Sequence, residues 1–120
     1  MTHQMWYNEE HELLQLKIAN VFTKSDVSEM RDNLFTMLEG KPYRQLIVTL
    51  EKSAKVEDRE TRSNINQALV DADISDVVFI GGGAANRMIA KVLLKTGVIK
   101  TKGDFFKEEE EGIKWLKNRR

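Results

Sequence analysis

The apolar residues of this chain come in short runs that alternate with longer segments of helical spacing. Leu46–Leu50 and Val77–Ile80 are almost continuously apolar and too short for helices, which is typical of strands buried on both faces of a sheet. Leu14, Leu16 and Ile18 alternate with polar residues, as in a strand that buries one face. Strands that alternate with helices predict an α/β protein.

Four segments have the apolar spacing of amphipathic helices. Their apolar faces are Val27, Met30, Leu34, Met37 and Leu38; Ile65, Ala68, Leu69 and Ala72; Ala85, Met88, Ile89, Val92 and Leu93; and Ile113 with Leu116. Thr23 and Ser25 are the N-cap candidates of the first helix, and Gly40 and Gly97 are the expected stops of the first and third. Glu108–Glu111 favours the dipole at the start of the last helix.

An opening hairpin and a short last strand complete the predicted order. The hairpin runs from Met5–Tyr7 through a turn at Asn8–Glu10 to Leu13–Ala19, and the last strand is Phe105–Phe106. The order is therefore β-β-α-β-α-β-α-β-α, and right-handed crossovers make the sheet mostly parallel. We expect a single domain over residues 1–120, with a mixed sheet of about five strands and four helices.

Charge and cysteine content exclude several classes of protein. The chain has 120 residues, with 19 Lys and Arg against 19 Asp and Glu and no cysteine. The absence of cysteine rules out disulfides, thiol nucleophiles and thiolate metal sites. Neutrality argues against a dedicated nucleic-acid binder, and no apolar run reaches the length of a membrane span. We expect a soluble, cytoplasmic protein.

The C-terminal third resembles the STAS family, the sulfate-transporter and anti-sigma-factor-antagonist domains. The resemblance rests on the strand Val77–Ile80 with a small-residue turn, on Arg87–Val98 with its Leu-x-x-Thr-Gly-apolar ending, and on Phe105–Leu116 with its Ile-x-Trp-Leu helix. More specifically, the chain resembles the small bacterial proteins related to the sporulation anti-sigma-factor antagonist. The resemblance implies a STAS-like fold and a regulatory binding module rather than an enzyme.

The resemblance also implies a phosphorylated serine at the start of the second helix, within an Asp-x-Ser-Gly motif. The matching region, Glu51–Ser63, lacks that motif but offers Ser53 and Ser63 as acceptors beside the cations Arg59 and Arg62. A polar connection after a parallel strand is also where open α/β sheets place ligands. A solvated loop with a frayed helix start is the alternative interpretation.

Gly81, Gly82 and Gly83 join a strand to a helix, and two interpretations stay open. Backbone N–H groups at a helix N-terminus favour a phosphate or another anion. The spacing lacks the third glycine of the dinucleotide fingerprint, and no Gly-Lys-Ser/Thr follows. A tight turn that needs positive φ explains the same residues.

Basic residues on the third helix form the last notable pattern. Arg87, Lys91 and Lys95 are spaced four residues apart, so they make one exposed ridge, and the helical wheel places Leu94 on the same outward side. A partner surface and a merely solvated face are both consistent with this ridge. The two histidines, His3 and His11, lie near a terminus and a turn and do not define a metal site.

These patterns predict a non-enzymatic regulatory module that binds a protein, such as a kinase or an anti-sigma factor. Its expected contact surface joins the Glu51–Ser63 loop, the start of the second helix and the third-helix ridge. No catalytic residue, cofactor or metal is predicted, and a dimer stays open. Two alternatives remain: a small-molecule or lipid carrier of the CRAL-TRIO-like kind, lined by Met30, Met37 and Met88, and a nucleotide-responsive switch at the three glycines.

Overall fold

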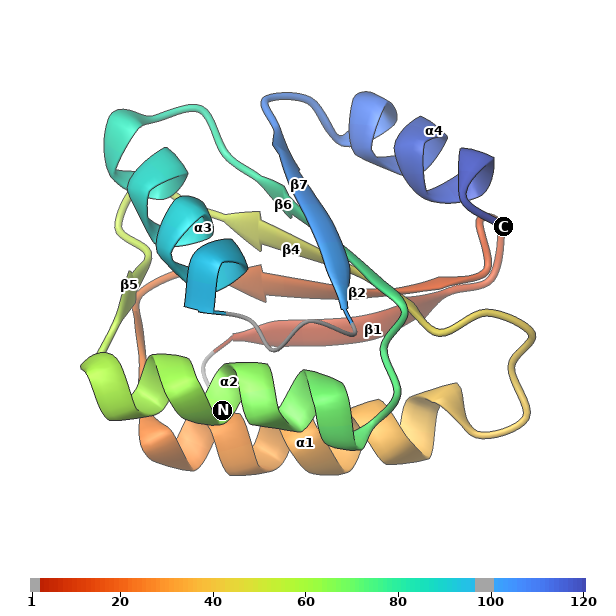
Figure 1. Ribbon diagram of the computed structural model, residues 1–120, viewed down its shortest axis with the longest axis horizontal. Coiled ribbons are helices and arrows are strands. Elements are labelled where there is room, and N and C mark those ends of the chain that lie inside the picture. Colours follow the sequence, from red (N-terminus) through yellow and green to blue (C-terminus); the bar gives the residue numbers. More distant parts are fainter. Residues whose placement is uncertain (1–2, 97–100) are drawn as a thin grey trace.

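The computed structural model describes residues 3–96 and 101–120 and contains a five-stranded sheet with helices on both faces (Figure 1). The strands of this sheet are β1 (Gln4–Asn8), β2 (Leu13–Ile18), β4 (Gln45–Leu50), β6 (Asp76–Ile80) and β7 (Lys102–Phe106). The helices are α1 (Lys24–Leu38), α2 (Arg59–Asp71), α3 (Ala84–Thr96) and α4 (Glu109–Asn118). The predicted α/β class, the mixed sheet and the order of its strands and helices are confirmed.

The strand order in the sheet is β1-β2-β4-β6-β7, with β1 antiparallel to β2 and every later pair parallel. Because β4 and β6 are neighbours, the segments that follow them leave the sheet side by side at its carboxyl edge. Those segments are the polar connection after Leu50 and the glycine turn after Ile80. This edge is where open α/β sheets usually bind ligands.

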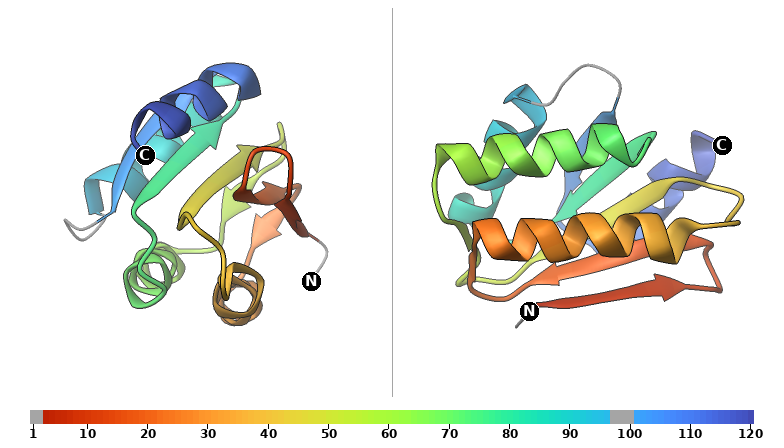
Figure 2. Two further views of the ribbon diagram at one scale, coloured as in Figure 1. Left: turned by 90° about the vertical axis from the view of Figure 1, so that its right-hand side faces the viewer. Right: turned by 90° about the horizontal axis from the view of Figure 1, so that it is seen from below.

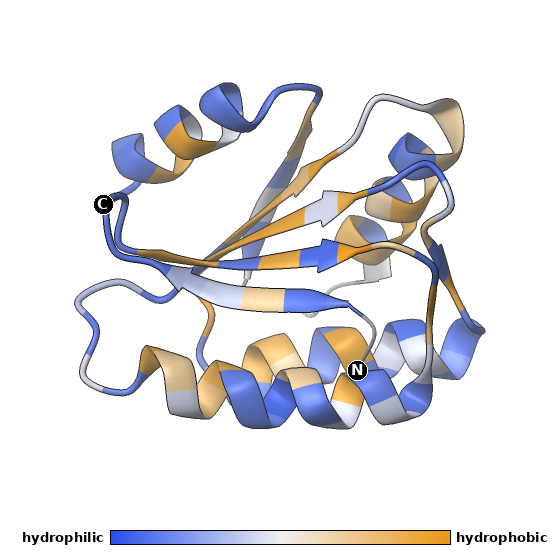
Figure 3. Ribbon diagram, turned by 180° about the vertical axis from the view of Figure 1, so that it is seen from behind, coloured by the Kyte–Doolittle hydropathy of each residue, from blue (hydrophilic) through white to orange (hydrophobic). Residues whose placement is uncertain are grey.

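Three helices cover one face of the sheet and one covers the other (Figure 2). The apolar stripes of α1, α2 and α3 pack on one side, around residues such as Leu16, Val48 and Phe79. The second apolar cluster, between α4 and the opposite face, is smaller and includes Val78 and Leu116. The coloured ribbon shows apolar residues on the inward faces of the helices and polar residues outside (Figure 3).

Two very short strands form a second parallel sheet that sequence reasoning did not predict. They are β3 (Val21–Phe22) and β5 (Lys55–Val56). Two residues are too few to show any periodicity, so pairing between distant segments creates these strands rather than local preference. They tie the segment before α1 to the segment before α2.

The ends of two elements differ slightly from the prediction. Thr23 is the N-cap of α1, and its Oγ1 accepts from the N–H of Asp26 at 3.3 Å while the Asp26 carboxylate accepts from Thr23 N–H at 2.9 Å. Ser25 was the wrong alternative, because it lies inside the helix. The hairpin turn spans residues 9–12 rather than 8–10, and β1 continues to Asn8.

Gly112 lets α4 lie close to the sheet, and this close approach generates a prediction. A Cβ at Gly112 would come within 2.6 Å of Val78 Cγ1, whereas a Cβ at Gly82 would meet nothing within 4 Å. We expect Gly112→Val to lower the free energy of unfolding by about 1–3 kcal/mol through overpacking. Gly82→Ala, the control, should change it by less than about 0.5 kcal/mol in the same urea titration. Equal stabilities for the two variants would contradict the close packing.

Candidate functional site

The connection between β4 and α2 is mostly exposed, as the solvated-loop alternative expects, but hydrogen bonds hold it in place and the start of α2 is not frayed. Ala54 is buried, and its N–H donates to Glu51 O at 3.0 Å. Lys55 N–H donates to Asn20 O at 3.1 Å, so the connection is bonded to the segment before β3. The start of α2 is therefore held in place.

Asp58 is the N-cap of α2, a role that the sequence analysis did not assign to it. Its Oδ1 accepts from the Thr61 N–H at 2.8 Å and from the Thr61 hydroxyl at 2.7 Å, and Lys24 Nζ lies 3.5 Å from Oδ2. The two hydrogen bonds from Thr61, followed by the charge of Lys24, hold the pKa of Asp58 below its usual value. The start of α2 thus carries a fixed negative charge.

Neither predicted phosphoacceptor stands at that helix start. Ser53 lies in the turn before β5, where its hydroxyl donates to Ala19 O. Ser63 is exposed and lies within the second turn of α2. Thr61 is the hydroxyl residue closest to the N-cap, but its side chain is fully buried and hydrogen-bonded to Asp58. The structure therefore separates Ser53 from Ser63 by an ordered segment.

Ser63 lies among the predicted cations of α2. Together with Arg59, Arg62 and Val92 of α3 it lines an open hollow of about 580 Å³, which we call the α2–α3 hollow. Within the described parts of the chain, neither arginine forms a salt bridge with a carboxylate. Arg59, Arg62 and Ser63, expected to act together, are brought together here.

The backbone of the glycine turn does not have the positive φ that the tight-turn interpretation required. Among the described glycines only Gly40 has positive φ, so the expectation of positive φ at Gly81, Gly82 or Gly83 was wrong. Gly81 is needed for close approach instead, because a Cβ there would come within 2.8 Å of the Asn86 side chain. Gly82 and Gly83 face open space. Anion binding at this turn stays a prediction.

Asn86 sets the rotation of α3 about its own axis. Its side chain is buried, and Nδ2 donates to Leu50 O at 3.1 Å at the end of β4. Ala90 and Leu93 follow at helical spacing and are also buried, so these three residues form the inner face of α3. The predicted inner face was therefore wrong in part: Met88 is 68% exposed.

Leu94 also differs from the prediction. It is half-buried and packs against the core, so it is not the exposed leucine of an outward ridge. The rotation set by Asn86 turns it toward β7. Arg87, Lys91 and Lys95 are exposed as predicted, and we keep the name α3 ridge for these three. With Leu94 and Phe105 they line an open groove of about 410 Å³, the α3–β7 groove.

Met88 lies between the two cationic features. At 100° per residue, the helix places its side chain between Lys95 of the α3 ridge and Val92 of the α2–α3 hollow. The exposed side of α3 therefore has an apolar centre with cations on both flanks. This arrangement was not predicted from the sequence, because the hydropathy pattern places Met88 on the apolar face of the helix.

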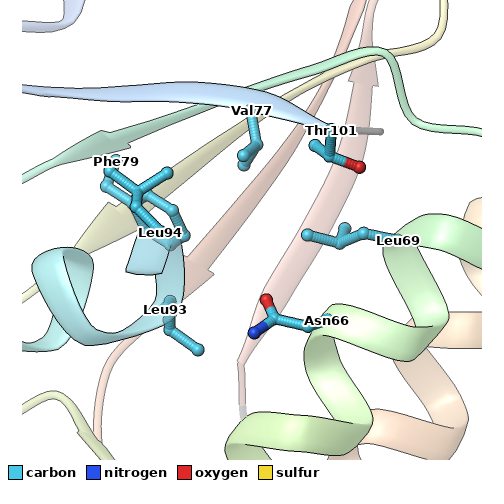
Figure 4. A pocket seen from close by; sticks show the side chains of 7 residues that line it. All are labelled: Asn66, Leu69, Val77, Phe79, Leu93, Leu94 and Thr101. Carbon is cyan, nitrogen blue, oxygen red and sulfur yellow. The ribbon is translucent and has the colours of Figure 1, made fainter. Parts of the chain in front are cut away.

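The space inside the fold is small. An inner cavity between α2, α3, β6 and the residue before β7, Thr101, measures about 20 Å³, and its lining includes Asn66 and Phe79 (Figure 4). A second cavity, deeper in the apolar core, measures about 10 Å³. Each is at the scale of one water molecule. Neither of these two cavities is large enough to hold the lipid or small molecule of the carrier alternative.

In the part of the chain that the structure describes, the histidines and acidic side chains do not come together as a metal site. His3 is buried, with Nδ1 accepting from Ala19 N–H at 3.1 Å and Nε2 lying 3.2 Å from Asp26 Oδ2. His11 lies beyond the other end of β1, in the hairpin turn. No group of three potential metal-binding His, Asp or Glu side chains occurs among residues 3–96 and 101–120. Within those same ranges, no helix has both the length and the apolar content needed to cross a bilayer.

Comparison with solved structures shows similar folds at low sequence identity. A DUF3478-family protein with a SpoIIAA-like fold from Shewanella loihica PV-4 is 14% identical, with a TM-score of 0.65 over 96% of this chain and 92% of its own. The anti-sigma factor antagonist SpoIIAA in its unphosphorylated form is 10% identical, with a TM-score of 0.63 over 97% of this chain and 98% of its own. A Ser-to-Glu variant of RsbS from Moorella thermoacetica is 15% identical, with a TM-score of 0.59 over 99% and 97%.

No family model matches the sequence, and no curated protein matches it either. The structural matches nevertheless agree with one another, since all three are SpoIIAA-like and cover nearly the whole chain. The chain therefore has the SpoIIAA-like STAS fold, as the resemblance in its C-terminal third predicted.

The Asp58 cap predicts a pH dependence of stability. Because its pKa is lower in the folded than in the unfolded chain, its charge stabilises the fold above about pH 4, the usual range of Asp, and that contribution is lost as the pH falls through the folded-state pKa. We expect the difference in free energy of unfolding between the wild type and Asp58→Ser, which keeps a neutral cap, to be constant from about pH 7 to 5 and to fall at lower pH. Urea titrations at each pH measure it. A difference that does not change down to pH 3 would contradict the assignment.

Proposed function

We propose that this chain is a non-enzymatic regulatory module that acts by binding another protein through the outer side of α3 and the start of α2. The observation that carries the proposal is Met88, a large apolar side chain that is 68% exposed between two groups of cations. An apolar centre with a charged rim is the usual anatomy of a protein interface. Cations around an apolar centre favour partners that carry negative charge at the matching positions.

Another exposed apolar residue, Phe35, shows why the surroundings of Met88 matter. Phe35 is 44% exposed on α1, and Arg31 lies over its ring at 5.3 Å. Arg31 is also paired with Asp71, so the charge there is balanced within the chain. The cations around Met88 have no such carboxylate among the described residues. Their charge is left for a partner.

The fold supports a regulatory role. The SpoIIAA-like fold is shared with an anti-sigma factor antagonist and with RsbS. A cytoplasmic kinase or anti-sigma factor is accordingly the kind of partner that we propose. The small inner cavities give the carrier alternative no support, and the nucleotide switch at the glycine turn has no observation in its favour beyond the turn itself.

Ser63 is the hydroxyl through which we propose that this surface is regulated. It is exposed in the α2–α3 hollow beside Arg59 and Arg62, so a phosphoryl group there would neutralise part of the cationic flank. Ser53 is the second acceptor that the sequence offers, but it lies in a different segment and donates to Ala19 O. We therefore propose Ser63 ahead of Ser53.

Site-specific photo-crosslinking in living cells tests the proposed surface. A benzophenone amino acid replaces Met88 in one variant and Phe35 in the other, so both probes sit at exposed apolar positions of the same fold. We expect the probe at 88 to give a discrete protein adduct and the probe at 35 to give none. The same adducts from both positions, or none from position 88, would contradict the proposed surface.

The regulatory part has its own pair of variants. Ser63→Glu, added to the chain that carries the probe at 88, should reduce the adduct severalfold because the new charge offsets the neighbouring arginines. Ser53→Glu makes the same change of charge outside the hollow and should leave the adduct unchanged. Equal adduct in both would remove Ser63 from the proposal while leaving the surface in place.

A further inference from the structure

The α3–β7 groove lies on the far side of the α3 ridge from Met88 and has a chemistry of its own. Its floor is apolar, made by Leu94 and Phe105, and its rim is the α3 ridge. A volume of about 410 Å³ is sufficient for a few side chains. The inference drawn from this groove rests on the proposed function, because it specifies the chemistry of the protein partner.

Gly103 is the reason that the groove has an apolar floor. A Cβ at Gly103 would collide with Leu94 Cδ2 and would come within 3.0 Å of Val77 Cγ1. Without that Cβ, α3 lies close against β7 and Leu94 reaches the strand. Phe105, two residues further along β7, faces the same side of the sheet and extends the floor.

The charge of the rim is not balanced within the described chain. The guanidinium of Arg87 lies 5.7 Å from the centre of the Phe105 ring, while none of the three ridge cations forms a salt bridge with a described carboxylate. From Ala84 to Lys102 the sequence has five basic residues and no acidic one. A cleft with low-dielectric walls and charge of one sign concentrates ligands of the opposite sign.

The nearest acidic residue on β7, Asp104, does not enter the groove, because successive side chains of a strand point to opposite faces. Its carboxylate instead accepts from the N–H of Phe105 at 2.7 Å. Lys102 N–H and Phe106 O bond toward β6, so the backbone of Gly103 and Phe105 faces the open edge of the sheet. Asp104 thus occupies an edge donor that an added strand would need.

We propose that the α3–β7 groove binds an acidic segment of the partner protein, with an apolar side chain on Leu94 and Phe105 and carboxylates on the α3 ridge. Charge complementarity carries the choice of occupant. The apolar floor favours a peptide over a nucleic-acid strand, whose phosphates would leave it uncovered. Because Asp104 occupies a backbone donor at the edge of β7, docking by side chains is favoured over the addition of a strand.

A second copy of this chain is a less suitable occupant, although Glu108–Glu111 is exposed and acidic. Two copies that paired β7 against β7 about a twofold axis normal to the sheet would place their α3 helices on the same face, with the two ridges facing each other. Like charges would then oppose the contact. Self-association is therefore an outcome that the experiment distinguishes rather than the one proposed.

The test uses the purified full chain and defined synthetic probes. The main probe is a fluorescent ten-residue peptide in which Asp and Glu flank a central Leu-Phe pair. One control peptide has Asn and Gln in place of the acids, another has Ser-Gly in place of Leu-Phe, and a single-stranded oligonucleotide is the nucleic-acid probe. Fluorescence anisotropy gives the affinities, and ¹⁵N–¹H NMR shift changes locate the site.

We expect the acidic Leu-Phe peptide to bind, with shift changes confined to α3 and β7 and with affinity that falls as salt is raised. Both control peptides should bind at least tenfold more weakly. Lys91→Glu/Lys95→Glu should abolish binding, whereas Lys114→Glu/Lys117→Glu, with the same change of net charge at exposed positions of α4 on the opposite face of the sheet, should leave it intact. NMR spectra of both variants verify that they are folded.

Each contrary result overturns a definite part of the proposal. Equal binding of the acidic and neutral peptides would show that the α3 ridge does not contribute to binding. Tighter binding of the oligonucleotide would show that the groove binds a nucleic acid rather than a protein segment. Self-association that increases with concentration and is lost in Lys91→Glu/Lys95→Glu would replace the partner by a second copy. A crosslink from position 88 without peptide binding would leave the proposed function standing and reject the groove.

Discussion

The buried amide of Asn86 is the interaction on which the proposed surface depends. A buried polar group without a hydrogen bond costs free energy, and Asn86 Nδ2 finds its acceptor at Leu50 O, at the carboxyl end of the neighbouring strand, while Oδ1 has no partner among the described residues. Gly81 makes room for the amide directly beside the sheet. Together with the packing of Ala90 and Leu93, this contact fixes which side of α3 faces the core and which side faces the solvent.

The arrangement of the surface follows from that rotation. Met88 is turned outward, Leu94 is turned toward β7, and the α3 ridge falls between them. The α2–α3 hollow completes the surface, because β3 and β5 fix the connection before α2 and Asp58 caps its first turn. Local hydrogen bonds at the carboxyl edge of the sheet therefore position an apolar centre and two cationic flanks.

Most of the fold could be predicted from the sequence, since Leu46–Leu50 and Val77–Ile80 are short, nearly continuous apolar runs and the stripe of α1 has helical spacing. The rotation of α3 could not. Hydropathy alone assigns Met88 to the core and Asn86 to the surface. It contains no information on a hydrogen bond from Asn86 to a residue 36 positions earlier in the chain. The positions of the glycines that allow close packing depend equally on contacts between distant segments.

The candidate site was predictable as a set of residues but not as a geometry. Arg59, Arg62 and Ser63 were identified from the sequence, and the structure adds Val92 to them. Phe105 joins the groove only because Gly103 brings α3 against β7. Asp58 had a usable signal, because Asp is a favoured N-cap residue, but the polar segment Glu51–Asn64 has no apolar spacing to mark where the helix begins.

The rotation of α3 is the central claim, and the rates of methionine oxidation test it most directly. Brief treatment of the folded protein with hydrogen peroxide, followed by peptide mass spectrometry, compares Met88 with Met30, which is 1% exposed. With Met88 outward, it should be oxidised many times faster than Met30, and the two rates should converge once the protein is unfolded in urea. Equally slow oxidation of Met88 and Met30 in the folded protein would show that the Met88 side of α3 faces the core, and would contradict the proposed surface.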